Sequence, residues 1–146
     1  MEVIFQLNTA KKEDISEHFH KCSSLFTPTL SEKVNIEEYA KKIRLYAHTF
    51  EAWIENSLVG LNAIYLNQTE QKTGFITNIS VDSQIMGLGI GKIMLQQSLE
   101  YAKNIGFEFI NLETHISNHK AISFYLKNGF SIFLCNEEYI LFQIKL

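Results

Sequence analysis

Three glycines at alternate positions, Gly87, Gly89 and Gly91, stand between an expected strand that ends at Val81 and an expected helix. Glycine lets the backbone bend and lets a ligand approach it closely. The N–H groups of such a loop, with the positive end of the following helix, form a site for an anion such as a pyrophosphate. The segment therefore predicts an anion-binding loop, and a plain strand-to-helix turn without a ligand is the alternative.

The glycine spacing does not fit two common phosphate loops. Counted from Gly87, the dinucleotide fingerprint requires its third glycine at position 92, where the chain has Lys92. A Walker loop would require glycine at position 86 and Ser or Thr at position 93, where the chain has Met86 and Ile93. Both of these nucleotide-binding functions are excluded.

The histidines and cysteines do not indicate a metal site. His115 and His119 have i,i+4 spacing, but they stand on an expected strand and at the start of an expected helix, so they do not share one helix face. Cys22 and Cys135 are isolated, without the paired spacing of a zinc or redox motif. We expect two reduced thiols and no bound metal.

Hydrophobic periodicity indicates a mixed α/β (α+β) fold with the element order βααβββαβαββ. The expected strands cover residues 3–7, 49–54, 58–66, 74–81, 107–116, 130–134 and 139–144, and the expected helices cover residues 11–25, 31–47, 90–105 and 118–128. The strand-helix-strand crossover over residues 74–116 predicts one parallel pair inside an otherwise antiparallel sheet that helices flank.

Two segments, ITNISVDSQIMGLGIGKIMLQQSLEYAKNIGF and INLETHISNHKAISFYLKNGF, together resemble the acetyl-coenzyme A binding motif of the Gcn5-related N-acetyltransferase (GNAT) superfamily. The family pattern is a strand ending in a V-x-P-like turn, then Gln or Arg, then x-x-G-x-G or A opening a helix, and downstream N-x-x-A-x-x-x-Y-x-x-x-G-F. The second part is matched by Asn118, Ala121, Tyr125, Gly129 and Phe130.

The first part of the motif departs from the family at two positions. With Gly89-x-Gly91 opening the helix, Met86 stands where the family has Arg or Gln, and Ser83 stands where it has proline. A register that begins at Gln84 would start the helix two residues earlier. We expect the Met86 register, because it also places Val81, and backbone donors do not depend on the side chain at position 86.

The resemblance implies a splayed parallel pair of strands that receives the pantetheine arm of acetyl-CoA. It implies cofactor contacts at Ile79, Ser80, Val81, Met86, Gly87, Leu88, Gly89, Ile90, Gly91, Lys92, Asn118 and Ala121. Asn118 and Tyr125 are seven residues apart, about 10.5 Å along one helix face, and the small Ala121 between them leaves room for the arm.

The implied reaction is the attack of an amine on the acetyl thioester, which needs an oxyanion donor, a proton for the sulfur and an acceptor for the amine proton. The resemblance puts the oxyanion donor at an N–H near Val81. Tyr125 is the expected general acid, because a phenol with a pKa of about 10 keeps its proton at neutral pH. The base is left open between Glu113 and a water relay.

Length and composition bear on the number of domains, the partners and the localisation of the protein. The 146 residues suffice for a single acetyltransferase domain over residues 1–146, and the scattered charges with a net value of -3 argue against nucleic acid as a partner. No signal peptide or membrane span is recognisable, so we expect a cytoplasmic protein that is a monomer or homodimer. The acceptor, a small-molecule or peptide amine, is not identified by the sequence, and a catalytically weak acetyl-CoA sensor or interaction module is the alternative function.

Overall fold

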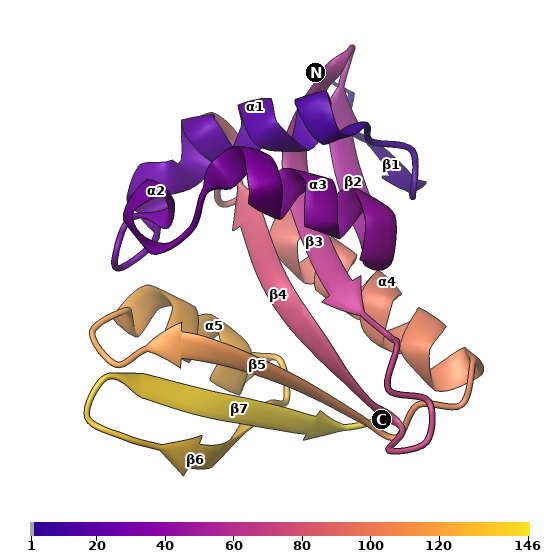
Figure 1. Cartoon of the computed structure of the whole chain (residues 1–146), viewed down its shortest axis with the longest axis vertical. Coiled ribbons are helices and arrows are strands. Elements are labelled where there is room, and N and C mark those ends of the chain that lie inside the picture. The colour runs from indigo at the N-terminus through magenta and orange to yellow at the C-terminus, as the bar shows by residue number, and fades with distance from the viewer. Residues whose placement is uncertain (1) are drawn as a thin grey trace.

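The computed structural model of the chain describes residues 2–146, which form a seven-stranded sheet with helices on both faces (Figure 1). Along the chain the elements are β1 (Ile4–Leu7), α1 (Lys12–Cys22), a 3₁₀ turn (Ser23–Leu25), α2 (Leu30–Lys33), α3 (Ile36–Tyr46), β2 (His48–Ile54), β3 (Ser57–Tyr65), β4 (Thr73–Val81), a second 3₁₀ turn (Ser83–Ile85), α4 (Ile90–Asn104), β5 (Phe109–His115), α5 (His119–Lys127), β6 (Ser131–Cys135) and β7 (Tyr139–Lys145).

The strands lie side by side in the order β1-β2-β3-β4-β5-β7-β6. β4 and β5 run parallel, and α4 is the crossover that a parallel connection requires. The other neighbouring strands are antiparallel. These pairings confirm the expected mixed, mostly antiparallel sheet with one parallel pair.

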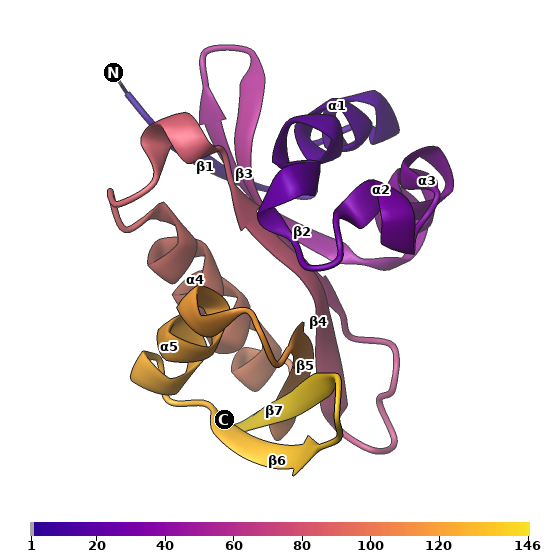
Figure 2. The same cartoon turned by 90° about the vertical axis from the view of Figure 1, so that its left-hand side faces the viewer.

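Two hydrophobic clusters cover the two faces of the sheet. α1 and α3 contribute Ile15, Phe19 and Ile43 to one cluster, and α4 contributes Met94 and Leu95 to the other. Figure 2 shows α1, α2 and α3 on one side of the sheet and α4 and α5 on the other. β3, the third strand of the sheet, is buried along nearly all of its length because helices pack on both of its faces.

The helix expected over residues 31–47 is in fact two helices, α2 and α3, so the observed order has one more short helix than the sequence predicts. The break has a local cause. Asn35 is the N-cap of α3, and its Oδ1 accepts the N–H of Glu38 at 3.0 Å. This cap satisfies a free N–H group at the start of α3 and sets the helix beginning at Ile36.

β4 and β5 pair only over their first halves. The paired residues run from Thr73 with Phe109 to Ile76 with Leu112, whereas β4 continues to Val81 and β5 to His115. Beyond Ile76 the two strands diverge, and Figure 1 shows them as the two arms of a V. The expected splay at the carboxyl ends of the parallel pair is therefore confirmed.

A β-bulge marks the point where the splay begins. Ala63 of β3 faces Asn78, but the next residue, Ile64, faces Ile76, so Thr77 is an extra residue on β4. A bulge bends the strand that carries it and increases its local twist. Since Thr77 directly follows the last residue paired with β5, the bulge turns β4 away from its parallel neighbour.

Candidate active site

A cavity of about 760 Å³ lies where β4 and β5 diverge. The residues expected from the sequence that line it are Ile79, Ser80, Val81, Met86, Gly87, Gly89, Ile90, Gly91, Lys92, Asn118, Ala121 and Tyr125. Leu88 lies outside this lining, because the loop turns its side chain toward solvent, where 60% of the residue is exposed. The structure thus brings together all but one of the expected positions.

The free edge of β4 presents backbone groups to this cavity. The N–H of Asp82 donates to the carbonyl of Val59 on β3 at 2.8 Å. Because successive residues of a strand direct their backbone groups to alternate edges, Val81 and Ile79 direct theirs to the opposite edge, where β5 has diverged. These unpaired groups can bond an extended ligand as if it were a neighbouring strand.

The glycine loop needs glycine for its backbone conformation at two positions. Gly87 has φ 86° and Gly89 has φ 78°, which L-residues adopt only with strain. Gly91 differs, since it lies inside α4, and a Cβ added there would meet Phe124 at 3.6 Å and Val81 at 3.7 Å, which are ordinary contacts. Packing within the chain does not demand glycine at position 91.

α4 begins at Ile90 with Gly89 as its N-cap, in the register that places Met86 at the position of the family's Gln or Arg. Its first helical hydrogen bond joins the N–H of Ile93 to the carbonyl of Gly89 at 3.1 Å. The N–H groups of Ile90, Gly91 and Lys92 precede that bond and have no acceptor within the helix. They lie at the positive end of the helix dipole, and all three residues line the cavity.

Met86 contacts a lysine of α5 across the cavity. Its sulfur lies 3.7 Å from the Nζ of Lys120, which also lines the cavity. Lys92 at the start of α4 lines the cavity as well, so two lysines line it together with the residues that carry the free N–H groups of α4. This end of the cavity is therefore suited to an anion.

Asn118 and Ala121 form the start of α5 on the other side of the cavity. The Oδ1 of Asn118 accepts the N–H of Ala121 at 3.2 Å, so Asn118 is the N-cap of this helix. The cap occupies the oxygen of the side chain and leaves its NH₂ group available to a ligand. Asn118 thus both sets the start of α5 and offers a donor to the cavity.

Tyr125 lies two turns along α5, 8% exposed, and lines the cavity. Its ring packs against Phe130 and Phe142, each with its centroid 5.8 Å away. Burial raises the pKa of the Tyr125 hydroxyl above its usual value, because the charged phenolate is poorly solvated there. At neutral pH the side chain is a protonated phenol that borders the cavity.

Glu113 of β5 also lines the cavity, two residues from His115. The neighbouring positions Leu112 and Thr114 are buried on the other face of the strand, so Glu113 and His115 point to the face that carries Tyr139 of β7. His115 bonds Ser117 through Nδ1 at 2.7 Å. In residues 2–146 no three His, Cys, Asp or Glu side chains gather as a possible metal site.

Sequence reasoning missed a buried polar connection behind the cavity. The Nε2 of His18 on α1 lies 2.9 Å from the Oγ of Ser80, which donates to the Oδ1 of Asn78 at 2.9 Å. Burial lowers the pKa of His18 to about 4, so the imidazole is neutral at pH 7. The available signal was that His18 lies three residues after the buried Ile15, on the same helix face.

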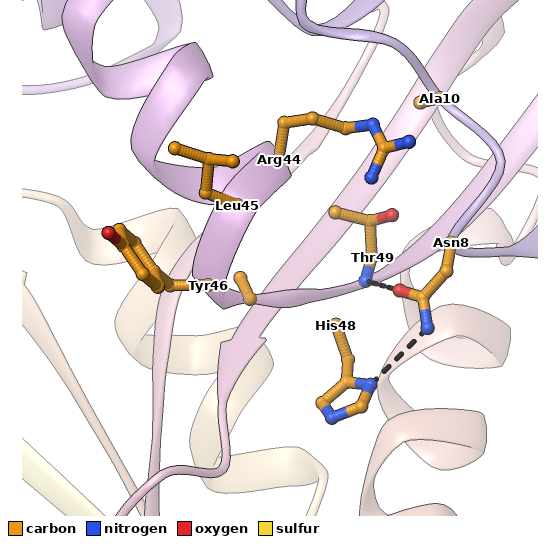
Figure 3. Close-up of a pocket in the computed structure, with 8 residues that line it drawn as sticks. Asn8, Ala10, Arg44, Leu45, Tyr46, His48 and Thr49 are labelled. Carbon is orange, nitrogen blue, oxygen red and sulfur yellow. Dashed lines mark hydrogen bonds between the residues drawn. The ribbon is translucent and has the colours of Figure 1, made fainter.

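A second hollow, of about 330 Å³, lies at the junction of α3 and β2 (Figure 3). The polar groups of Asn8 are used locally, since its Oδ1 accepts the N–H of Thr49 at 2.8 Å and its Nδ2 lies 3.3 Å from Nδ1 of His48. None of the residues expected to carry chemistry lines it. The cavity at the splay is therefore the candidate active site.

Comparison with known proteins identifies the family of this site. The sequence model of the Acetyltransferase (GNAT) family matches residues 12–130. The chain belongs to this family. Membership confirms the resemblance seen in the sequence. It also confirms the class of enzyme, an acetyltransferase whose acyl donor is acetyl-CoA.

Two relatives of this GNAT chain align over most of its length. It is 32% identical to N-alpha-acetyltransferase 30 of Schizosaccharomyces pombe in an alignment of 104 positions, and the match covers 64% of this chain and 68% of the relative. It is 28% identical over 106 residues to the N-acetyltransferase YvbK of Bacillus subtilis, which is 73% of this chain and 64% of the relative. The alignments thus span about two thirds of these two relatives.

Solved structures share the fold of this GNAT chain along its whole length. The PaiA N-acetyltransferase of Thermoplasma acidophilum, in complex with coenzyme A, superposes with a TM-score of 0.78 at 18% identity and covers 100% of both chains. The ribosomal-protein-S18-alanine N-acetyltransferase of Escherichia coli superposes with a TM-score of 0.76 at 18% identity, covering 97% of this chain and 94% of that one. Across residues 2–146, no helix is long and apolar enough to cross a bilayer.

Proposed function

We propose that this GNAT chain transfers the acetyl group of acetyl-CoA to a primary amine by direct attack within a ternary complex. The observation that carries the proposal is the lining of one cavity by the free edge of β4, the glycine loop, Asn118 and Tyr125. These are the donor-binding and proton-donating elements that the reaction needs, and they come from three separate segments of the chain.

The donor would bind along the α4 and α5 side of the cavity. Its pyrophosphate would accept the free N–H groups at the start of α4, with Lys92 and Lys120 adding positive charge. Its pantetheine arm would bond the backbone of Ile79 and Val81, and the NH₂ group of Asn118 would bond the arm from α5. Gly91 supports this arrangement, because its missing side chain is not required by packing within the chain.

In the proposed reaction the amine nitrogen forms a bond to the acetyl carbon, and the carbonyl oxygen becomes an oxyanion. The N–H of Val81 would donate to that oxyanion. When the carbon–sulfur bond breaks, the sulfur takes the proton of the Tyr125 hydroxyl, which solvent later restores. The amine proton leaves to Glu113 or through water, two routes that the sequence left open and that both fit the lining of the cavity.

Release of free coenzyme A thiol in the presence of a panel of amines tests this function. Direct attack predicts that thiol appears only when both acetyl-CoA and an amine are present, and that the protein mass does not change. A burst of thiol without amine, together with a protein mass increased by one acetyl group, would show an acetyl-enzyme and contradict the mechanism. An acetyl-CoA sensor without turnover is the alternative, and none of the contacts described above favours it.

We extend the proposal to the domain organisation, compartment and oligomeric state of the enzyme. We propose that residues 1–146 act as one acetyltransferase domain in the cytoplasm, as a monomer or homodimer. Two free cysteines, Cys22 and Cys135, fit a reducing compartment. Cell fractionation and light scattering of the purified chain would test compartment and oligomeric state.

A further inference from the structure

The cavity is lined from both helical layers. Gly87, Lys92 and Ala121 line it from the side of α4 and α5, and Pro28, Leu30 and Tyr39 line it from the side of α1, α2 and α3. Figure 2 shows these layers on opposite faces of the sheet. If the donor takes the α4 and α5 side, as the proposed function requires, the acceptor has to approach from the α1–α3 side.

The acceptor side of the cavity is largely apolar. Phe26, Pro28, Leu30 and Val34 line it, all from the segment that surrounds the short helix α2. Leu30 belongs to the hydrophobic cluster under α1 and α3, and Phe26 and Val34 pack against that cluster. These side chains are therefore held in place as a wall that can cover an apolar group of the acceptor.

The acceptor side also carries little charge. Among the described residues that line the whole cavity, Glu113 is the single carboxylate. Lys33 of α2 lies on the acceptor side, with its Nζ 5.1 Å from the ring centroid of Tyr139. An acceptor with one amine can place it near Glu113, whereas a second ammonium group would meet an apolar wall and the positive Lys33.

We propose that the acceptor is a monoamine with an apolar chain, and that diamines, polyamines and aminoglycosides are discriminated against. Desolvation is the physical reason, because an ammonium group without a carboxylate partner is strongly unfavourable in an apolar site. An apolar group at the same place gains from leaving water.

A matched pair of amines tests the proposal with the full chain. Heptylamine and 1,6-diaminohexane have the same length and differ by a methyl group in place of the second amine. We expect kcat/KM for heptylamine to be at least tenfold higher, about the discrimination that a small apolar contact supplies. The Lys33→Glu variant should reduce this ratio severalfold. Lys41→Glu is the control, because it makes the same change in net charge on an exposed residue of α3 outside the cavity lining.

Calorimetry of acetyl-CoA binding separates this proposal from the proposed function. If acetyl-CoA binds and diaminohexane is acetylated as well as heptylamine, the acceptor class is wrong while the transferase function stands. If the protein binds acetyl-CoA but releases thiol with neither heptylamine nor diaminohexane, the proposed acceptor class is also wrong. Equal effects of the Lys33 and Lys41 variants would contradict the role of the acceptor wall, and no binding of acetyl-CoA would contradict both proposals.

Discussion

The hydroxyl of Tyr39 lies 2.8 Å from the carbonyl oxygen of Thr77 and 2.7 Å from its Oγ1. Thr77 is the extra residue of the β4 bulge, so a side chain of α3 holds the strand at the point where it leaves β5. Burial raises the pKa of Tyr39 to about 12, and the protonated hydroxyl can donate to the carbonyl at neutral pH. The α3 helix thereby helps to fix the geometry of the splay.

Tyr39→Phe should lower the free energy of unfolding by about 1–2 kcal/mol, because it removes one partner of a partly buried carbonyl. Tyr65→Phe on β3 is the matched control. The Tyr65 hydroxyl is buried without a hydrogen-bond partner in the described part of the chain, so its removal should be neutral or stabilising. Urea unfolding of both variants measures the difference, and equal destabilisation would contradict the role assigned to the Tyr39 hydroxyl.

The free energy of unfolding should fall between about pH 6.5 and pH 4 because of His18. Burial lowers its folded pKa from 6.5 to about 4, so the unfolded chain binds the proton first as the pH falls. The loss amounts to about 3 kcal/mol for this one group. His18→Gln keeps a polar side chain beside Ser80 but does not titrate, so its unfolding free energy should lack this component. Parallel pH curves for the two proteins would refute the assignment.

Local sequence determined much of the fold and of the glycine-loop side of the cavity. β-branched and aromatic runs predicted the strands, and the crossover over residues 74–116 predicted the parallel pair. The glycines correctly predicted a loop that leads into a helix at Ile90. This was predictable because the turn itself requires a positive φ at Gly87 and Gly89. The spacing of Asn118, Ala121 and Tyr125 on one helix face likewise follows from local geometry.

The features that sequence reasoning missed depend on contacts between distant segments. The bulge at Thr77 and its bond to Tyr39 join residues that are 38 positions apart, and His18 reaches Ser80 across 62 positions. The break before α3 is an exception, because Asn35 followed by Glu37 and Glu38 is a local helix-start signal. The apolar acceptor wall becomes visible only when α2 is placed against the sheet.

Gly89→Glu should abolish acetyl-CoA binding by placing a carboxylate at the proposed pyrophosphate site. Gly89→Ala is the control for backbone strain, since either side chain costs about 1–2 kcal/mol at the left-handed φ of 78°. We expect the Glu variant to bind at least tenfold more weakly than the Ala variant in calorimetry, because it adds charge repulsion to the same strain. If the two variants bind equally well, the pyrophosphate lies elsewhere.

We propose that Tyr125 protonates the departing thiolate, and the turnover of the Tyr125→Phe variant decides whether it does. Phenylalanine keeps the ring between Phe130 and Phe142 and removes only the hydroxyl, so stability and acetyl-CoA affinity should stay close to those of the wild type. We predict that kcat falls by roughly 10²–10⁴, about 3–5 kcal/mol of barrier, on an acceptor for which chemistry limits the rate. Turnover within twofold of the wild type would mean that the thiolate leaves without a proton from Tyr125 and would rule out this residue as the general acid.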